Sequence, residues 1–219
     1  MIDARKILEE VISKLHIIPS TDIPAIDLYM DQVTTFMNKH LASQKRYEED
    51  KILTKTMINN YAKNNLLPPP EKKRYSKDHM IMLIFIYYFK NILTINDIKT
   101  ILGPLSDQFF HSNSKQNLES IYSSLCQTES CQVGSVKSDI EHRIFRAEKA
   151  FTDYPEPERE YLQLFSLITS LIYDVYIKKL MIEELIDQFV KKQQARQSEK
   201  DAKKKSQEKS EKERAKDLR

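Results

Sequence analysis

Residues 54–102 decide the fold of this chain, and they read TKTMINNYAKNNLLPPPEKKRYSKDHMIMLIFIYYFKNILTINDIKTIL. Threonine and serine are favoured residues before the first turn of a helix, so Thr54 and Ser76 each predict the start of one. Proline lacks the amide proton that a helix interior uses and disfavours helical geometry in the residue before it. We therefore expect a first helix over 54–66 that the three prolines at 68–70 bring to an end.

Composition indicates a mainly α protein. The 219 residues include only two glycines, Gly103 and Gly134, and no tryptophan. Sheet-rich folds need glycine in many turns, whereas lysine, glutamate and leucine, which are abundant here, favour helices. The length is enough for one or two domains with a hydrophobic core.

Apolar residues recur at helical spacing along most of the chain. This periodicity predicts further helices over 3–16, 25–41, 77–93, 95–102, 139–151 and 157–195. The helix 95–102 is expected to end at Gly103-Pro104. Residues 42–51 are polar and predict a loop, and residues 105–135 are expected to be less regular. Beyond Gln193 the apolar pattern disappears, which predicts either a solvated, fraying helix or a disordered tail.

Charge is distributed unevenly along the chain. The net charge is +3, yet residues 51–104 alone carry nine basic and three acidic side chains. Residues 105–190 carry eight basic and fourteen acidic side chains, and residues 191–219 carry twelve and six. A basic segment within an acidic body is typical of a surface that faces phosphate, although such blocks also arise for solubility alone.

The order of features in the basic segment resembles the MerR-like winged helix-turn-helix domain. In that family a recognition helix ends in a Gly-Leu-Leu/Ile-Pro turn, a wing with Arg and Tyr follows, and two helices complete the unit. The matching residues are Met57, Ile58, Tyr61, Leu66-Leu67-Pro68, Arg74-Tyr75-Ser76, Leu93, Ile95, Ile98 and Leu102. Through the stretches IDLYMDQVT (26–34) and LTKTMINNY (53–61), the whole chain is similar to a bacterial family known only as a domain of unknown function. The resemblance implies a MerR-like winged helix-turn-helix with additional N- and C-terminal helices.

Two features depart from the MerR-like pattern. Recognition helices of that family usually carry Arg where this chain has Asn59, and the short wing, residues 70–75, contains no glycine.

Several polar and basic residues are candidates for contact with duplex DNA. A helix can enter the major groove, where asparagine pairs with adenine, and a basic projection can follow the phosphate backbone. The candidates are Thr54, Lys55, Thr56, Asn59, Asn60, Tyr61, Lys63, Lys72, Lys73, Arg74 and Tyr75. The tyrosines are also open to a plainer interpretation as half-buried aromatic residues, and Lys72-Lys73-Arg74 as a solvated turn.

Four regions follow from these features. Residues 1–32 form an N-terminal helical segment that packs on the body, and 33–104 the winged helix-turn-helix. Residues 105–192 form a helical dimerisation or sensing domain, and 193–219 a charged, disordered tail.

The predicted helix 157–195 is apolar on more than one stripe, so it needs cover on several sides. A second copy of the chain, meeting it at Ile168, Leu171, Ile172, Val175 and Leu185, is one source of cover. Packing of the first two helices within the same subunit is the other.

Catalytic and metal-binding patterns are absent from the sequence. No zinc-protease, phosphate-loop or nucleophile-elbow motif occurs, and the histidines lack metal-ligand spacing. Cys126 and Cys131 are too few for a disulfide framework and are expected to be reduced thiols, although one bridge, a shared metal or a redox sensor remain alternatives. We predict that the protein is not an enzyme, has no cofactor and is cytoplasmic. We also predict no membrane span, because the sequence has no uninterrupted run of about 18 apolar residues.

The leading hypothesis is a DNA-binding transcriptional regulator that reads duplex DNA with helix 54–66 and the wing 70–75. The alternative is a protein-interaction module that has the same fold and does not bind nucleic acid. A third hypothesis is non-specific binding through the lysine-rich tail, residues 193–219.

Overall fold

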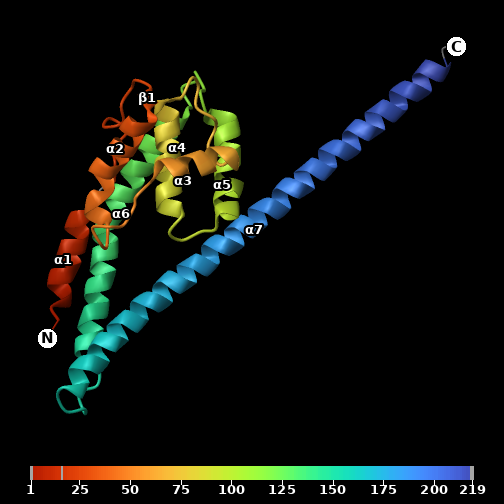
Figure 1. The fold of residues 1–219 in the computed structure, drawn as a ribbon. Coiled ribbons are helices and arrows are strands. Elements are labelled where there is room, and N and C mark those ends of the chain that lie inside the picture. The colour runs from red at the N-terminus through yellow and green to blue at the C-terminus, as the bar shows by residue number, and fades with distance from the viewer. Residues whose placement is uncertain (1, 16, 218–219) are drawn as a thin grey trace. The chain divides into compact units, whose positions relative to one another are not determined.

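The computed structural model describes residues 2–15 and 17–217, with side chains except those of 129–131 and 200–217. Within these residues the chain forms seven α-helices, a short 3-10 helix and two very short strands (Figure 1). The expectation of a mainly α fold is confirmed. The helices are α1 (Ala4–Lys14), α2 (Met30–Leu41), α3 (Lys55–Lys63), α4 (Lys77–Phe89), α5 (Ile95–Phe109), α6 (Leu118–Glu148) and α7 (Glu158–Asp217); η1 is Ala42–Gln44, β1 is Leu28–Tyr29 and β2 is Arg74–Tyr75.

Residues up to Val175 form one compact unit, and those from Tyr176 onward form a second. The second unit is the continuation of helix α7, in which Lys179 pairs with Glu183 one turn later.

Helix α4 is the centre of the main core. Every residue from His79 to Tyr87 is buried, so the helix is covered around its whole circumference. It contacts β2, α5 and α6, and the core around it also includes side chains from α2 and α3. The run MIMLIFIYYF at 80–89 has no polar side that could face solvent. A helix that is apolar on all sides requires such cover.

The core extends across the sequence position 104/105, where we expected one region to give way to the next. Leu118 and Tyr122 of α6 belong to the same buried cluster as Met37 of α2 and Ile98 of α5. Helices α5 and α6 therefore complete the covering of α4.

Helix α1 packs along α6, as Figure 1 shows. Its Leu8 joins a second, smaller cluster with Ile144, Ala147 and Leu167. Ion pairs cross the same contact, with Arg5 2.7 Å from Glu148 and Lys137 2.6 Å from Glu9. Ile12 also packs against this cluster, whereas Ile7, Val11 and Leu15 are exposed.

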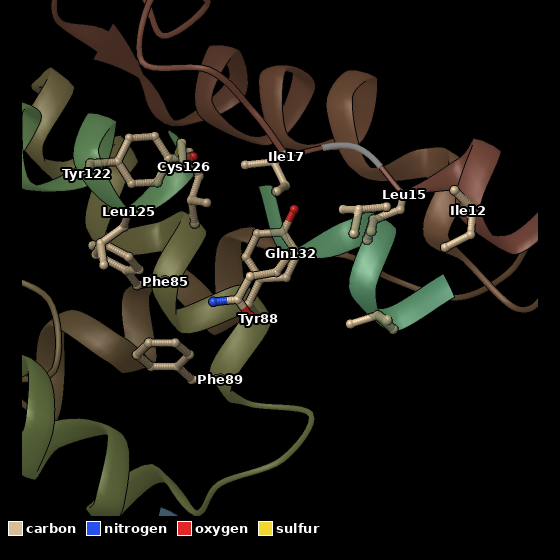
Figure 2. Close-up of a pocket in the computed structure, with 13 residues that line it drawn as sticks. Ile12, Leu15, Ile17, Phe85, Tyr88, Phe89, Tyr122, Leu125, Cys126 and Gln132 are labelled. Atoms are coloured by element: carbon tan, nitrogen blue, oxygen red, sulfur yellow. The ribbon is translucent and has the colours of Figure 1, made fainter. Parts of the chain in front are cut away.

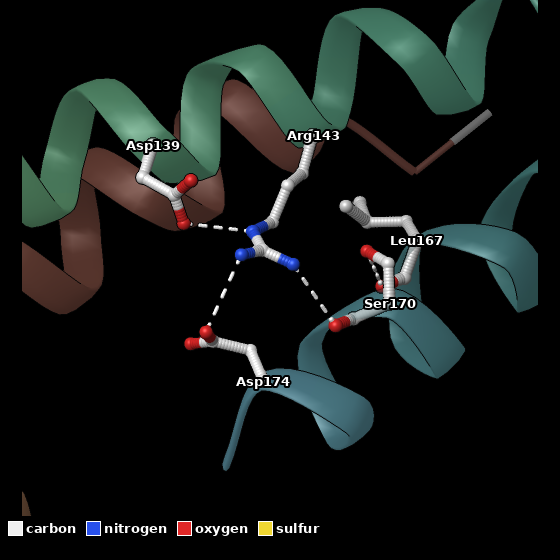
Figure 3. A network of polar contacts seen from close by, with 5 residues as sticks. All are labelled: Asp139, Arg143, Leu167, Ser170 and Asp174. Atoms are coloured by element: carbon white, nitrogen blue, oxygen red, sulfur yellow. Dashed lines mark hydrogen bonds and ion pairs between the residues drawn. The ribbon is translucent and has the colours of Figure 1, made fainter. Parts of the chain in front are cut away.

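One arginine joins α6 to the beginning of α7 (Figure 3). Arg143 Nε donates to Asp139 Oδ2 at 2.7 Å on its own helix. Its Nη1 donates to the Ser170 carbonyl at 3.1 Å, and its Nη2 donates to Asp174 Oδ1 at 3.3 Å. The guanidinium thus bridges the two helices through three acceptors.

A short antiparallel strand pair stands where we expected the beginning of the helix 25–41. Leu28 is paired with Tyr75 and Tyr29 with Arg74, so β1 lies beside β2. Helix α2 starts only at Met30, and the Gln32 side chain accepts a hydrogen bond from the Tyr29 N–H at 2.8 Å. A two-residue strand carries no periodic signal, and its partner is distant in sequence.

Helix α3 is shorter than predicted, because it ends at Lys63 and not at the prolines. Asn65 has a φ of 53°, in the left-handed region that commonly closes a helix. The chain leaves the helix there, and Leu66 and Leu67 turn into the core before Pro68 is reached.

Helix α5 is longer than predicted, since it continues through Gly103 and Pro104 to Phe109. Proline normally disfavours helical geometry in the preceding residue through a clash with that residue's Cβ. Gly103 has no Cβ, so the part of this clash that involves the Cβ is absent.

The segment expected to be irregular is largely helical. Helix α6 starts at Leu118, where the Asn117 side chain accepts from the Ser120 N–H at 2.9 Å, and it runs without a break to Glu148. The backbone of α7 is likewise helical to Asp217, so of the two alternatives for the tail the structure has the helix.

Candidate nucleic-acid interface

Helix α3 is fixed by its cap and by its buried face. The Thr54 hydroxyl accepts a hydrogen bond from the Met57 N–H at 3.1 Å, which satisfies one of the free amides of the first turn. Ile58 and Tyr61 are buried in the main core. Thr54 is therefore a capping residue, and its hydroxyl is already engaged.

The opposite face of α3 is polar and open to solvent. Five of the predicted contact residues lie on it and are exposed: Lys55, Thr56, Asn59, Asn60 and Lys63. Their spacing of one, four, five and eight residues keeps them on one side of the helix. This face can offer amide and ammonium groups to a ligand.

One cation of this face has an acidic neighbour. Lys55 forms an ion pair with Asp31 in the first turn of α2, and both side chains are mostly exposed. The pair reduces the positive charge at the beginning of α3.

A tight turn of Glu71, Lys72, Lys73 and Arg74 precedes β2. The Arg74 N–H donates to the Glu71 carbonyl at 2.8 Å, and the two central residues have φ values of 48° for Lys72 and 65° for Lys73. Consecutive positive φ angles are characteristic of the tight turns that favour Asn-Gly. Lysine at such a position is unfavourable by roughly 1–2 kcal/mol. The chain thus has two exposed ammonium groups at the tip of the turn, although the positive φ angles there are unfavourable for lysine.

Arg74 lies against an aromatic ring of the neighbouring strand. Its Nη2 donates to the Tyr29 hydroxyl at 3.3 Å, and its guanidinium carbon is 5.4 Å from the centre of the Tyr29 ring. Stacking of this kind orders an arginine without neutralising its charge. Sequence reasoning missed Tyr29, because its part in the site depends on the pairing of β1 with β2.

Two predicted contact residues are in the core instead. Tyr61 and Tyr75 are buried, and burial raises the pKa of both hydroxyls. Their burial favours the plainer interpretation of both tyrosines as aromatic residues of the core. Tyr75 supports the turn from beneath, with its ring 5.5 Å from that of His79 in an edge-to-face arrangement.

His79 fixes the start of α4 directly after β2. Its Nδ1 accepts from the Ser76 N–H at 3.0 Å and lies 2.8 Å from the Ser76 hydroxyl. The side chain is buried, and its Nε2 has no hydrogen-bond partner among the described residues. Removal from water lowers the pKa of the imidazole, although the carbonyls of Pro68 and Pro69 oppose this change. The neutral ring is thus the form that caps the helix.

The arrangement presents positive charge and hydrogen-bond donors on one surface. Residues 54–75 carry five basic side chains and one acidic side chain. In the described part of the chain, no three His, Cys, Asp or Glu side chains are grouped so as to hold a metal ion. The surface is suited to binding a polyanion by contact alone.

The residues predicted for dimerisation fall into two groups. Ile168, Ile172 and Val175 in the first unit, and Leu185 in the second, are exposed. Leu171 instead packs against the small cluster between α1, α6 and the start of α7. It is therefore partly covered by its own chain.

Comparison with known proteins gives a match to a family model. A family model described as a domain of unknown function, DUF1836, matches residues 18–125. The chain contains a DUF1836 domain. This DUF1836 domain extends from the loop before β1 to the first turns of α6, so it includes α3, the basic turn and the whole of α4. No curated protein and no solved structure matches the chain.

None of the helices, over the residues that are described, combines the length and the apolar character needed to cross a membrane.

Cys126 is half-buried with its Sγ 3.8 Å from the Ile18 carbonyl, and the side chain of Cys131 lies outside the described residues.

Proposed function

We propose that the chain is a DNA-binding regulator with a MerR-like winged helix-turn-helix arrangement. In this proposal the exposed face of α3 enters the major groove, and the turn 71–74 lies along the phosphate backbone. The order of elements supports it: two helices, α2 and α3, are followed by a basic turn, a short strand and the buried helix α4. Both α3 and β2 pack on α2, so this helix holds the exposed face of α3 and the turn 71–74 close to each other.

The observation that carries the proposal is the pair of lysines at the tip of the turn. Lys72 and Lys73 occupy positive-φ positions, where glycine or asparagine would be more stable. Unfavourable backbone conformations of this kind concentrate at functional sites. Contact with phosphate would require the two ammonium groups. Glycine or asparagine would suit the backbone better but could not make this contact.

The same observation supplies a test that separates binding from folding. Changing Lys72→Asn together with Lys73→Gly removes two charges and installs the residues favoured in this turn. We expect thermal stability to be unchanged or raised, and affinity for mixed genomic DNA fragments to fall about tenfold or more at low salt. The slope of log affinity against log salt should fall by about two, one for each lost phosphate contact.

A matched control removes the same charge elsewhere. Lys6→Gln with Lys14→Gln alters two exposed lysines of α1 and should leave the salt slope unchanged. Absence of binding by the unaltered protein at low salt, or an equal loss in both double variants, would refute the DNA proposal. Truncation after Lys192 should weaken binding and reduce its salt sensitivity without abolishing it, whereas a tail-driven binder would lose it entirely.

One observation favours the alternative of a protein-interaction module. Lys55, at the beginning of α3, is paired with Asp31, so an acidic group stands beside the surface that would face DNA. Under this alternative, Asp31→Asn would leave the chain without DNA affinity. Under the DNA proposal the same change should strengthen binding, because it removes a charge that repels phosphate.

We also propose a homodimer formed through α7, which would present two copies of the surface to one duplex. Tyr161, Phe165, Ile168, Ile172 and Val175 follow one another at alternating spacings of four and three residues, and all are exposed. This is the repeat by which helices pair side by side. A second copy covers the row by symmetry, and sedimentation velocity over a range of concentrations tests it.

A further inference from the structure

We infer that the pocket between the end of α1, α4 and α6 binds a small, uncharged and largely apolar molecule. The pocket has a volume of about 450 Å³ (Figure 2). Ligand pockets in proteins commonly enclose about 300–1,000 Å³. The inference stands without the proposed DNA contact, because it concerns a different part of the molecule.

The walls of the pocket come from segments far apart in the sequence. Helix α4 contributes Ile84, Phe85, Tyr88 and Phe89, and helix α6 contributes Tyr122, Leu125, Cys126, Gln132, Val133 and Val136. Ile12 of α1, with Leu15 and Ile17 after the helix, forms the remaining side. The floor lies on α4, the most deeply buried helix, whose packing against α6 fixes the two main walls relative to each other.

The chemistry of the lining determines the class of ligand. Among the side chains that the structure describes, the lining includes no aspartate, glutamate, lysine or arginine, so a charged molecule would lose its hydration without gaining a partner there. The Tyr122 hydroxyl donates to the Ile18 carbonyl at 2.6 Å, and Gln44 Nε2 lies 3.5 Å from the Tyr88 hydroxyl. Both phenol hydroxyls thus already bond to the protein, so a ligand would contact the aromatic rings of these tyrosines.

Aromatic rings dominate the inner wall. Phe85 stacks on Phe89 at 5.8 Å and meets Tyr122 edge to face at 5.5 Å. Rings arranged in this way accept another ring in offset or edge-to-face contact. The exposed amide of Gln132 is available for a single polar group of the guest. The occupant is therefore a molecule of about two or three linked rings, or an aliphatic chain of similar bulk, with at most one neutral polar group.

A fluorescence titration with N-phenyl-1-naphthylamine, an uncharged aromatic amine, tests the inference on the full-length chain. We expect a saturable increase in emission with one molecule bound per chain. Val133→Trp places an indole within the pocket and should weaken this binding at least tenfold. Val11→Trp makes the same change at an exposed valine of α1 outside the pocket and should leave it unaltered.

A second measurement keeps the test decisive if Val133→Trp fails to fold. In a Cys131→Ser background, saturating probe should slow the modification of Cys126 by N-ethylmaleimide at least threefold, because Cys126 lines the pocket. Emission that does not saturate, that persists in folded Val133→Trp, or that leaves Cys126 modification unchanged would overturn the inference. Loss of self-association in Val133→Trp but not in Val11→Trp would also overturn it, since a second chain would then be the occupant.

Discussion

Replacing Arg143 by methionine should destabilise the first unit by about 2 kcal/mol. Methionine keeps the apolar stem of the side chain and removes its three hydrogen bonds. The pair with Asp139 lies within one helix and is half exposed, so it contributes about 0.3–0.5 kcal/mol. The bonds to the Ser170 carbonyl and to the less exposed Asp174 join two helices and contribute about 1 kcal/mol each, because only 18% of the arginine side chain is exposed.

Urea unfolding followed by circular dichroism measures this change. With a slope of about 2 kcal/mol per molar urea, the midpoint should fall by about 1 M. Arg146→Met is the matched control, since Arg146 is an exposed arginine one turn further along α6. All variants must be compared at one protein concentration, because self-association would raise the apparent stability.

A double-mutant cycle isolates the contact between the helices. Asp174→Asn combined with Arg143→Met should reveal a coupling energy of about 1 kcal/mol. If Arg143→Met lowers the midpoint no more than Arg146→Met does, the three acceptors do not clamp α7 to α6, and the reasoning is wrong.

The remaining predictions concern pH, helix propensity and association. The folded state lowers the pKa of His79 below 6.5, so the unfolded chain binds the extra proton and stability is lost as pH falls below 6.5. His79→Gln retains an acceptor for the Ser76 N–H, and its melting temperature should vary less over that range. Gly134→Ala should stabilise α6 by about 0.5–1 kcal/mol in urea unfolding, since an added Cβ meets nothing within 4 Å. Gly103→Ala should instead destabilise α5, because the added Cβ would meet the ring of the proline that follows. Ile172→Glu, at a side chain that is 60% exposed, should abolish dimers in sedimentation velocity without lowering the helix content.

Local signals made much of the helical fold predictable. Thr54 caps a helix through its side chain and Ser76 is the residue before another, and both are visible as short-range patterns in the sequence. The apolar run that follows Ser76 identified the central helix, because no solvent-facing residue interrupts it.

Non-local and backbone effects explain what the sequence did not reveal. The end of α3 depends on the left-handed conformation of Asn65, which asparagine adopts only in context. The passage of α5 through Pro104 depends on the absence of a Cβ before it. The Ser- and Gln-rich beginning of α6 is helical because Leu118 and Tyr122 enter a core formed by distant residues, so tertiary packing outweighs its weak periodicity.

The candidate surface was predictable in part. The exposed lysines and asparagines were identified by residue type and helical spacing, and their exposure follows from the burial of Ile58 on the other side of α3. The burial of Tyr61 and Tyr75 could not be read from their type, since tyrosine occurs in both environments. The pocket over α4 left no signal, because its walls meet only in the folded chain.

The pairing of Tyr29 with Arg74 also bears on the order of folding. It joins the two ends of the segment 29–74, so α2 and α3 lie within a closed loop of the backbone. The entropic cost of closing a loop grows with the logarithm of the loop's length. Contacts between distant residues offset this cost only after the loop has closed. The two helices depend mainly on neighbouring residues and can form early. The strand pair should therefore be among the last contacts made, which means that the arginine of the turn is brought into place only when the segment has folded.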